Sequence, residues 1–247
     1  MVDSFLEAAL SDTKKLPKAV IAPHAGYVYS GPVAGSAFRC WAETGAEAAR
    51  VVVLGPSHWV DFEGIALPRA GVFSTPLGHV PLDMDAIGRL HRLPQVVEFD
   101  PAHEYEHCVE VELPFLQVTL ARFSLVPLVI GDVPDEQVRE VIDLLWGGPE
   151  TRFVISSDLS HYHDYLTARR IDAATAKAIE QAQIAGLNAE QACGFRAIRG
   201  FLLSAPSKGI AATTIDLRNS GDTAGPRDRV VGYGAFHFRE GERPEEH

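Results

Sequence analysis

The sequence has few cysteines and no long apolar run, and both absences narrow the kind of protein it encodes. Its 247 residues include only three cysteines, Cys40, Cys108 and Cys193. An odd and sparse set of thiols argues against a disulfide framework and suits a reducing compartment. No apolar run approaches the roughly 20 residues of a membrane span, and the N-terminus lacks the basic and apolar regions of a signal peptide. We therefore expect a cytoplasmic protein.

Positive charge is also scarce, because the sequence has 22 lysines and arginines but 33 aspartates and glutamates, which gives a net charge of −11. This balance disfavours nucleic acid or an anionic membrane surface as a partner. The sequence also lacks repeats, low-complexity segments and a linker, while hydrophobic residues make up 46% of it. We therefore expect one domain over residues 1–247, with a charged and flexible tail at 240–247.

Short apolar, β-branched runs alternate with helical patterns along most of the chain. Such runs are typical of the buried strands of a parallel sheet, and the alternation predicts a three-layer α/β/α sandwich with a mostly parallel central sheet. Val33, Ala37, Phe38 and Trp41 fall on one face of a helix that we expect to begin at Pro32, because proline suits a first helical position. The expected strands are 18–22, 50–55, 64–67, 124–130, 152–156 and 229–238, and the other expected helices are 4–10, 83–93, 110–120, 134–146, 168–185 and 189–204.

Two of the expected strands are followed by the same pair of residue types. KAVIAPH ends on His24 and VVVLGPSH ends on His58, while FVISSDLSHYH turns polar at Asp158 and His161. In open α/β sheets, ligands collect at the carboxyl ends of the strands. The sequence therefore predicts that these four side chains meet at one edge of the sheet, as a metal or acid/base site of an enzyme.

Each of these residues also has a structural interpretation. Asp158 is either part of the site or the N-cap of a helix, and its spacing to His161 could place both side chains on one face of a turn. His161 is a candidate for proton transfer because a free imidazole titrates near neutrality. No G-x-S-x-G elbow is present, so Ser57 beside His58 does not indicate a serine hydrolase.

The stretch HEYEHCVEVELP offers further donors. His107 and Glu110 are three residues apart and share a face if the stretch is helical, so they could bind a metal or support its ligands, although most charged stretches are solvated surfaces. Cys193 is expected to open the helix that contains Phe195, Ile198 and Leu202, where a thiol is either a small apolar filler or a thiolate with a lowered pKa. Spacing alone favours the structural interpretation of Cys193.

The motifs IAPHAGYVYSG, LGPSHWV, EHCVEVELPF, VISSDLSHY and ACG resemble, in this order and from about residue 18 to 236, those of the Memo family. Its bacterial and archaeal members are called AmmeMemoRadiSam system protein B. Members of the family usually carry an A-G-S-[FW]-Y segment before the first helix, and this sequence lacks it. The family is similar in fold to class III extradiol dioxygenases, a LigB-like arrangement with a non-haem iron site. The resemblance implies that His24, His58 and Cys193 hold a metal, with Asp158 and His161 beside it and His161 acting as an acid or base.

The resemblance implies a metal-dependent, dioxygenase-like oxidoreductase whose substrate is unknown. Fe(II) is the first expected metal, and copper or zinc remain open because a thiolate is a softer donor than a carboxylate. Two other functions stay open: a non-catalytic module that binds a peptide or partner protein, and a zinc-dependent hydrolase. The substrate or peptide would occupy the strand-end pocket, lined by Tyr27, Tyr29 and Trp59 unless these rings pack in the core. The family name also suggests a functional link to AMMECR1-like and radical SAM proteins.

Overall fold

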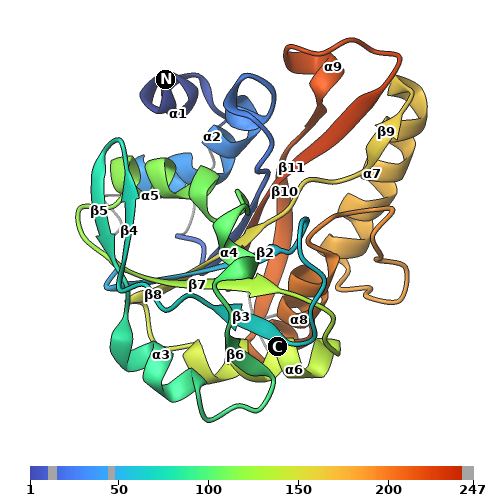
Figure 1. Cartoon of the computed structure of the whole chain (residues 1–247). Coiled ribbons are helices and arrows are strands. Elements are labelled where there is room, and N and C mark those ends of the chain that lie inside the picture. The colour runs from blue at the N-terminus through green and yellow to red at the C-terminus, as the bar shows by residue number, and fades with distance from the viewer. Residues whose placement is uncertain (11–15, 44–47, 241–247) are drawn as a thin grey trace, which may run out of the picture.

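The computed structural model describes residues 1–10, 16–43 and 48–240, so the predicted tail, apart from Glu240, lies outside the described residues. A central sheet of nine strands has the order β10-β11-β1-β8-β2-β7-β3-β6, with β9 paired to β11 (Figure 1). Its strands are β1 (Ala19–Ala22), β2 (Arg50–Pro56), β3 (Ile65–Leu67), β6 (Val96–Glu98), β7 (Ser124–Ile130), β8 (Thr151–Ser156), β9 (His161–His163), β10 (Ile210–Asn219) and β11 (Val230–Glu240). A separate hairpin pairs β4 (Val72–Thr75) with β5 (Gly78–Pro81).

The centre of the sheet is parallel and buried on both faces. Strands β1, β8, β2 and β7 lie side by side in parallel, and almost every residue in them is buried. This explains why their sequences are continuous apolar runs instead of alternating patterns. Antiparallel pairs flank this centre, with β11 beside β1 and β3 beside β7. The prediction of a mostly parallel sheet is confirmed.

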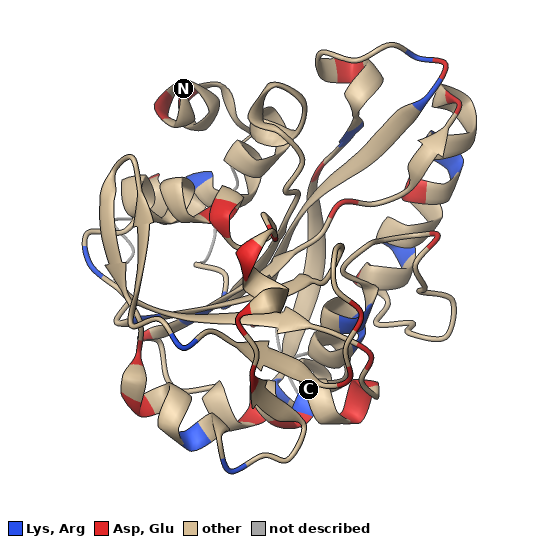
Figure 2. Cartoon of the chain, viewed as in Figure 1, with Lys and Arg blue, Asp and Glu red and all other residues tan. Residues whose placement is uncertain are grey.

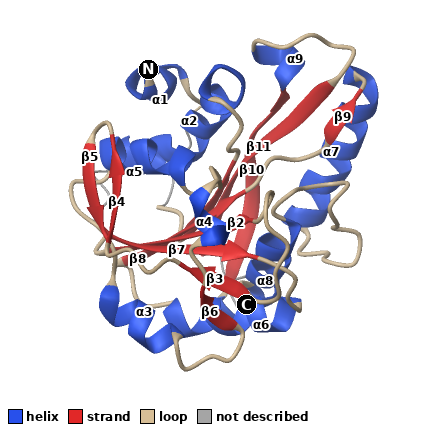
Figure 3. Cartoon of the chain, viewed as in Figure 1, coloured by secondary structure: helices blue, strands red, loops and turns tan. Residues whose placement is uncertain are grey.

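Helices cover both faces of the sheet and bury two apolar clusters (Figure 3). Helices α3 (Met84–Leu90), α6 (Asp135–Leu145), α7 (Tyr165–Glu180) and α8 (Phe195–Ser204) contribute to one cluster, and α1 (Val2–Ala8), α2 (Tyr27–Glu43) and α5 (Leu113–Thr119) contribute to the other. The short elements are α4 (Pro101–Glu104), η1 (Glu110–Glu112), η2 (Pro206–Lys208) and α9 (Ser220–Thr223). Charged residues gather on the helices and loops, leaving most of the sheet uncharged (Figure 2). These layers confirm the predicted α/β/α sandwich.

Helix α2 begins at Tyr27, five residues before the position predicted from Pro32. The Gly26 carbonyl oxygen accepts hydrogen bonds from the N–H groups of Tyr29 and Ser30, which starts the helix with only four residues between it and β1. Pro32 therefore lies inside the helix and removes one hydrogen bond from it. The predicted buried face is correct, since Val33, Ala37, Phe38 and Trp41 are fully buried.

Other predicted boundaries near the site also differ. Cys193 does not open a helix, because α8 begins two residues later at Phe195, with Gly194 as its N-cap. Asp158 does not cap a helix either, because no helix follows it before β9. Helix α1 spans Val2–Ala8 instead of the predicted 4–10, and Leu10 beyond its end is exposed. Among the described residues, no helix is long and apolar enough to cross a membrane.

Candidate metal centre

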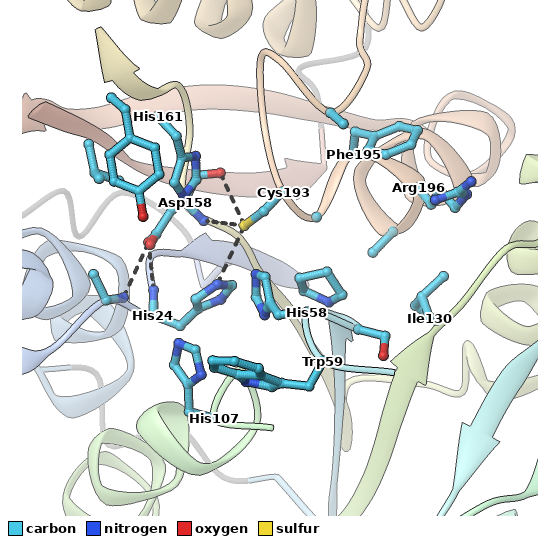
Figure 4. Close-up of a pocket in the computed structure, with 18 residues that line it drawn as sticks. His24, His58, Trp59, His107, Ile130, Asp158, His161, Cys193, Phe195 and Arg196 are labelled. Atoms are coloured by element: carbon cyan, nitrogen blue, oxygen red, sulfur yellow. Dashed lines mark hydrogen bonds between the residues drawn. The ribbon is translucent and has the colours of Figure 1, made fainter. Parts of the chain in front are cut away.

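Three neighbouring parallel strands deliver the predicted site residues to one edge of the sheet (Figure 4). His24, His58 and Asp158 each lie two residues beyond the end of their strand, which is β1, β2 or β8 respectively. Strand β8 pairs in parallel with both β1 and β2, so the three strand ends are adjacent. The structure therefore brings together side chains that are up to 134 residues apart in sequence.

The centre of the site is a cluster of three imidazoles, from His24, His58 and His107. Each ring offers one ligand atom, and these atoms all lie within 4.8 Å of one another. The ring centroids of His24 are 5.2 Å from His58 and 5.4 Å from His107. Imidazole nitrogens bind iron, copper and zinc, so this donor set fits a transition metal. His107, predicted as a supporting residue, thus lies among the candidate ligands.

His24 is oriented by a buried serine at the end of β8. Its Nδ1 lies 2.7 Å from the Ser156 hydroxyl oxygen. That hydroxyl has one proton, which it donates to the Cys108 carbonyl oxygen at 2.6 Å or to Glu112 Oε1 at 2.8 Å. In both cases Ser156 Oγ accepts from Nδ1–H, which leaves Nε2 of His24 with its lone pair toward the cluster. Burial, helped by the other imidazoles, lowers the pKa of His24 well below its usual range, so the ring is neutral.

His58 is oriented by Glu106. One carboxylate oxygen lies 2.8 Å from His58 Nδ1, and the other accepts the His58 backbone N–H at 2.7 Å. Burial by itself raises the pKa of Glu106, but the hydrogen bonds from His58 outweigh it and bring that pKa down to about 2. Glu106 is therefore a carboxylate that fixes the tautomer of His58 and leaves its Nε2 available, as carboxylates do behind metal-bound histidines.

Cys193 approaches the cluster from the opposite wall. Its Sγ lies 3.4 Å from His24 Nε2 and accepts the Asp158 backbone N–H at 3.3 Å. The thiol does not belong to the set of atoms that lie within 4.8 Å of one another. Burial raises the pKa of Cys193 to about 12, so the thiol keeps its proton when no metal is bound. Ligation by Cys193 would release that proton.

Asp158 and His161 lie beside the imidazole cluster with different surroundings. Asp158 Oδ1 accepts the backbone N–H groups of His24 at 2.9 Å and Ala25 at 3.3 Å, which fixes the exit of β1. Burial raises the pKa of Asp158 above its ordinary value. His161 is half-buried on β9, and its ring forms no hydrogen bond with the residues that the structure describes. Its imidazole is therefore available to a bound molecule.

These residues line a pocket of about 650 Å³, a size suited to a small organic molecule. Trp59 stands at the pocket with 68% of its surface exposed. The predicted lining residues Tyr27 and Tyr29 lie outside it, as does Glu110, which was predicted to bind a metal or support its ligands. Because α2 starts at Tyr27, that ring turns toward α5, where its hydroxyl donates to the Val111 carbonyl oxygen, and with Glu110 it lines a separate cavity of about 290 Å³.

Glu106, Ser156 and Glu112 support the cluster; Ser156 was not predicted, and Glu106 and Glu112 were predicted only as members of the donor-rich stretch HEYEHCVEVELP. The His107–Glu110 spacing was expected to share a helical face, but residues 105–109 are not helical and η1 begins only at Glu110. Glu112 is fully buried, and burial raises the pKa of its carboxyl well above the usual range. The only sequence signal for Glu106 was its position beside His107, which by itself indicates no contact with His58.

Comparison with known proteins agrees with the motifs. A family model described as Memo-like protein matches residues 1–237. A MEMO1 family protein of Saccharolobus islandicus (strain Y.N.15.51) is 33% identical over 232 residues, covering 88% of this chain and 81% of the relative. A MEMO1 family protein of Sulfolobus acidocaldarius is also 33% identical, over 231 residues and with the same coverage.

A solved structure supports the fold alone. The uncharacterized protein JW3007 from Escherichia coli K12 superposes with a TM-score of 0.56 at 15% sequence identity, covering 90% of this chain and all of that one. The family itself is shown by the model match and by the sequence identity over most of both chains. The chain therefore belongs to the Memo family.

Proposed function

We propose that this protein is a metal-dependent oxidoreductase that acts on a small molecule in the strand-end pocket. The observation that carries the proposal is the cluster of three imidazoles whose ligand atoms lie within 4.8 Å of one another. Two of these imidazoles have a buried oxygen acceptor on Nδ1, which leaves Nε2 for a metal. A purely structural cluster would not need two rings that present Nε2 to the same point.

The proposed ligands are His24 and His58, with Cys193 as the third donor that the family resemblance implies. The geometry adds His107 as a further donor, which would bind the metal either in place of Cys193 or together with it. Nitrogen and thiolate donors suit iron and copper, and a site with three protein ligands leaves a position for substrate. Non-haem iron is the first candidate, and copper is the second.

A bound iron or copper ion would supply a redox-active centre that also polarises a coordinated oxygen atom. The surrounding residues then have separate tasks. His161 accepts or returns a proton of the substrate, since its ring is free of other described hydrogen bonds and lines the same pocket. Asp158 holds the backbone of His24 in place, and Trp59 limits the access of water at the pocket entrance.

The proposal is tested by elemental analysis and electron paramagnetic resonance on protein purified without oxygen and without a metal-chelating tag. We expect about one iron or copper per chain, lost in His24→Ala and in His58→Ala. His79→Ala is the matched control, because His79 is exposed on the β4–β5 hairpin. Comparing Cys193→Ser with His107→Ala shows which of the two side chains is the third ligand.

Other metal contents would favour a different function or refute the ligand assignment. Stoichiometric zinc would favour a hydrolase, in which the metal activates water. Protein that takes up no iron, copper or zinc while remaining folded would favour a module that binds a peptide or partner. Unchanged metal content in both His24→Ala and His58→Ala would refute the ligand assignment.

A further inference from the structure

A second cavity, of about 530 Å³, lies at the opposite edge of the sheet from the imidazole cluster. Strand β8 connects the two places, since Arg152 near its start lines this cavity and Ser156 at its end contacts His24. The four residue steps from Arg152 to Ser156 span roughly 13 Å along the strand. The cavity is therefore separate from the proposed metal centre. Its cationic lining residues are Lys18, Arg152 and Lys208, in a chain with a net charge of −11.

Arg152 is a buried cation that has no direct hydrogen-bond or ion-pair partner for its guanidinium among the described residues, although the charge of Glu150 acts on it from a distance. Only 7% of its surface is exposed, and its Nε is buried without a hydrogen-bond partner. Within the described ranges, its guanidinium forms no ion pair and no hydrogen bond with a side chain or carbonyl oxygen. Buried charges in proteins are normally paired, because an isolated charge loses its hydration. An anion that enters the cavity would supply the missing partner.

Lys18 adds a second cation, which forms no direct ion pair with a carboxylate of the described chain, although the charge of Glu150 partly offsets it. Its ammonium donates to the carbonyl oxygens of Trp146 at 2.6 Å and Gly148 at 2.7 Å, just beyond the end of α6. Burial, followed by the positive charge of Arg152, lowers the pKa of Lys18 to about 8. The two cations are thus close enough to repel one another.

The residues that line the cavity remain cationic as a set, with Lys18, Arg152 and Lys208 against the single carboxylate of Glu240. Lys208 lines the cavity and lies 3.1 Å from Asp143. Glu150 does not line the cavity, and its Oε1 accepts the Gly148 N–H and the Thr151 hydroxyl, while its charge also acts on Lys18 and Arg152. Glu240 also lines the cavity, but its side chain is exposed and forms no ion pair with a described residue.

We propose that this cavity is a binding site for a small phosphate-bearing anion, with Arg152 and Lys18 as its inner donors and Lys208 at its entrance. A phosphate group has several acceptor oxygens, and arginine presents its donors in a fork that matches them. The volume is sufficient for inorganic phosphate or a small phosphorylated metabolite. Free phosphate and a phosphorylated molecule share this chemistry. Comparing the affinity for inorganic phosphate with the affinity for glycerol phosphate distinguishes the two.

The test is a calorimetric titration of the purified full chain with inorganic phosphate and, separately, with glycerol phosphate, at constant ionic strength. We expect one anion per chain, with the affinity lowered at least tenfold in Arg152→Met and severalfold in Lys208→Met. Lys208→Met keeps the test informative if Arg152→Met fails to fold, because the Lys208 side chain is 25% exposed. Lys177→Met is the control, since Lys177 is exposed on α7 outside this cavity, and its affinity should equal that of the unaltered protein.

A second readout locates the bound anion. Phosphate bound next to Lys18 should raise the pKa of its ammonium above about 8, which nitrogen-detected NMR measures. Binding should also persist in His24→Ala. Three results would overturn the proposal: no saturable binding of either anion, equal affinities in Lys208→Met and Lys177→Met, or binding that disappears in His24→Ala and therefore belongs to the metal centre.

Discussion

Replacing Glu106 with glutamine should weaken metal binding without removing any proposed ligand. The carboxylate accepts the His58 Nδ1–H and backbone N–H and also the His107 N–H at 3.0 Å. Glutamine has nearly the same shape, but its amide group carries no charge and presents an N–H where one of these donors now points. His58 would lose the partner that fixes its tautomer and its orientation.

The depressed pKa of Glu106 sets the size of the stability change. The shift from 4.5 to about 2 corresponds to about 3 kcal/mol of folding free energy, at roughly 1.4 kcal/mol per pKa unit. Because the pKa is lowered in the folded state, this stability is fully present above pH 4.5 and is lost as the pH falls toward 2. We therefore expect Glu106→Gln to be less stable at pH 7 and to lose less stability between pH 5 and pH 2.

The metal affinity is measured by competition with a chelator, and the stability by urea unfolding across this pH range. Loss of a carboxylate behind a ligand typically lowers metal affinity about 10- to 100-fold. Glu110→Gln is the matched control, because Glu110 is exposed and lines a different cavity. Equal metal affinity in Glu106→Gln and the unaltered protein, or a larger loss in Glu110→Gln, would refute the assignment of Glu106 as the residue that positions His58.

Three further changes test other parts of the structure. Burial raises the pKa of Asp172 to about 6, so the protonated carboxyl stabilises the folded state at low pH. The free energy of unfolding, measured with urea, should therefore fall by about 3 kcal/mol as the pH rises from 4 to 7. Asp172→Asn should show no such fall. A methyl group at Gly55 would overlap Cys108 Sγ, so Gly55→Ala should lower the free energy of unfolding by about 1–3 kcal/mol. Gly71→Ala is the control and should leave that free energy nearly unchanged, because a methyl group at Gly71 would meet open space. Gly88 is exposed inside α3, and Gly88→Ala should raise the melting temperature, because alanine is favoured over glycine in a helix by up to about 1 kcal/mol.

The strands of the sheet centre were predictable because burial on both faces requires uninterrupted apolar runs. The runs expected at 50–55, 124–130 and 152–156 correspond to β2, β7 and β8 within one residue at each end. Elements with weaker patterns were missed. Strand β10 at the sheet edge mixes buried and exposed residues without regular alternation, and β9 has only three residues. Their pairing with β11 is a tertiary contact that no local pattern records.

The sequence by itself determined that His24, His58 and Asp158 lie at strand ends. A buried strand and the polar residue that follows it can both be recognised from neighbouring residues in the sequence. The motifs also identified the family, which the comparisons confirm. Only the tertiary structure decided which side chains support the cluster. Glu106 reaches His58 across 48 residues, and Ser156 reaches His24 across 132 residues. These contacts depend on the order of β1, β8 and β2 in the sheet, which the spacing of residues along the chain does not specify.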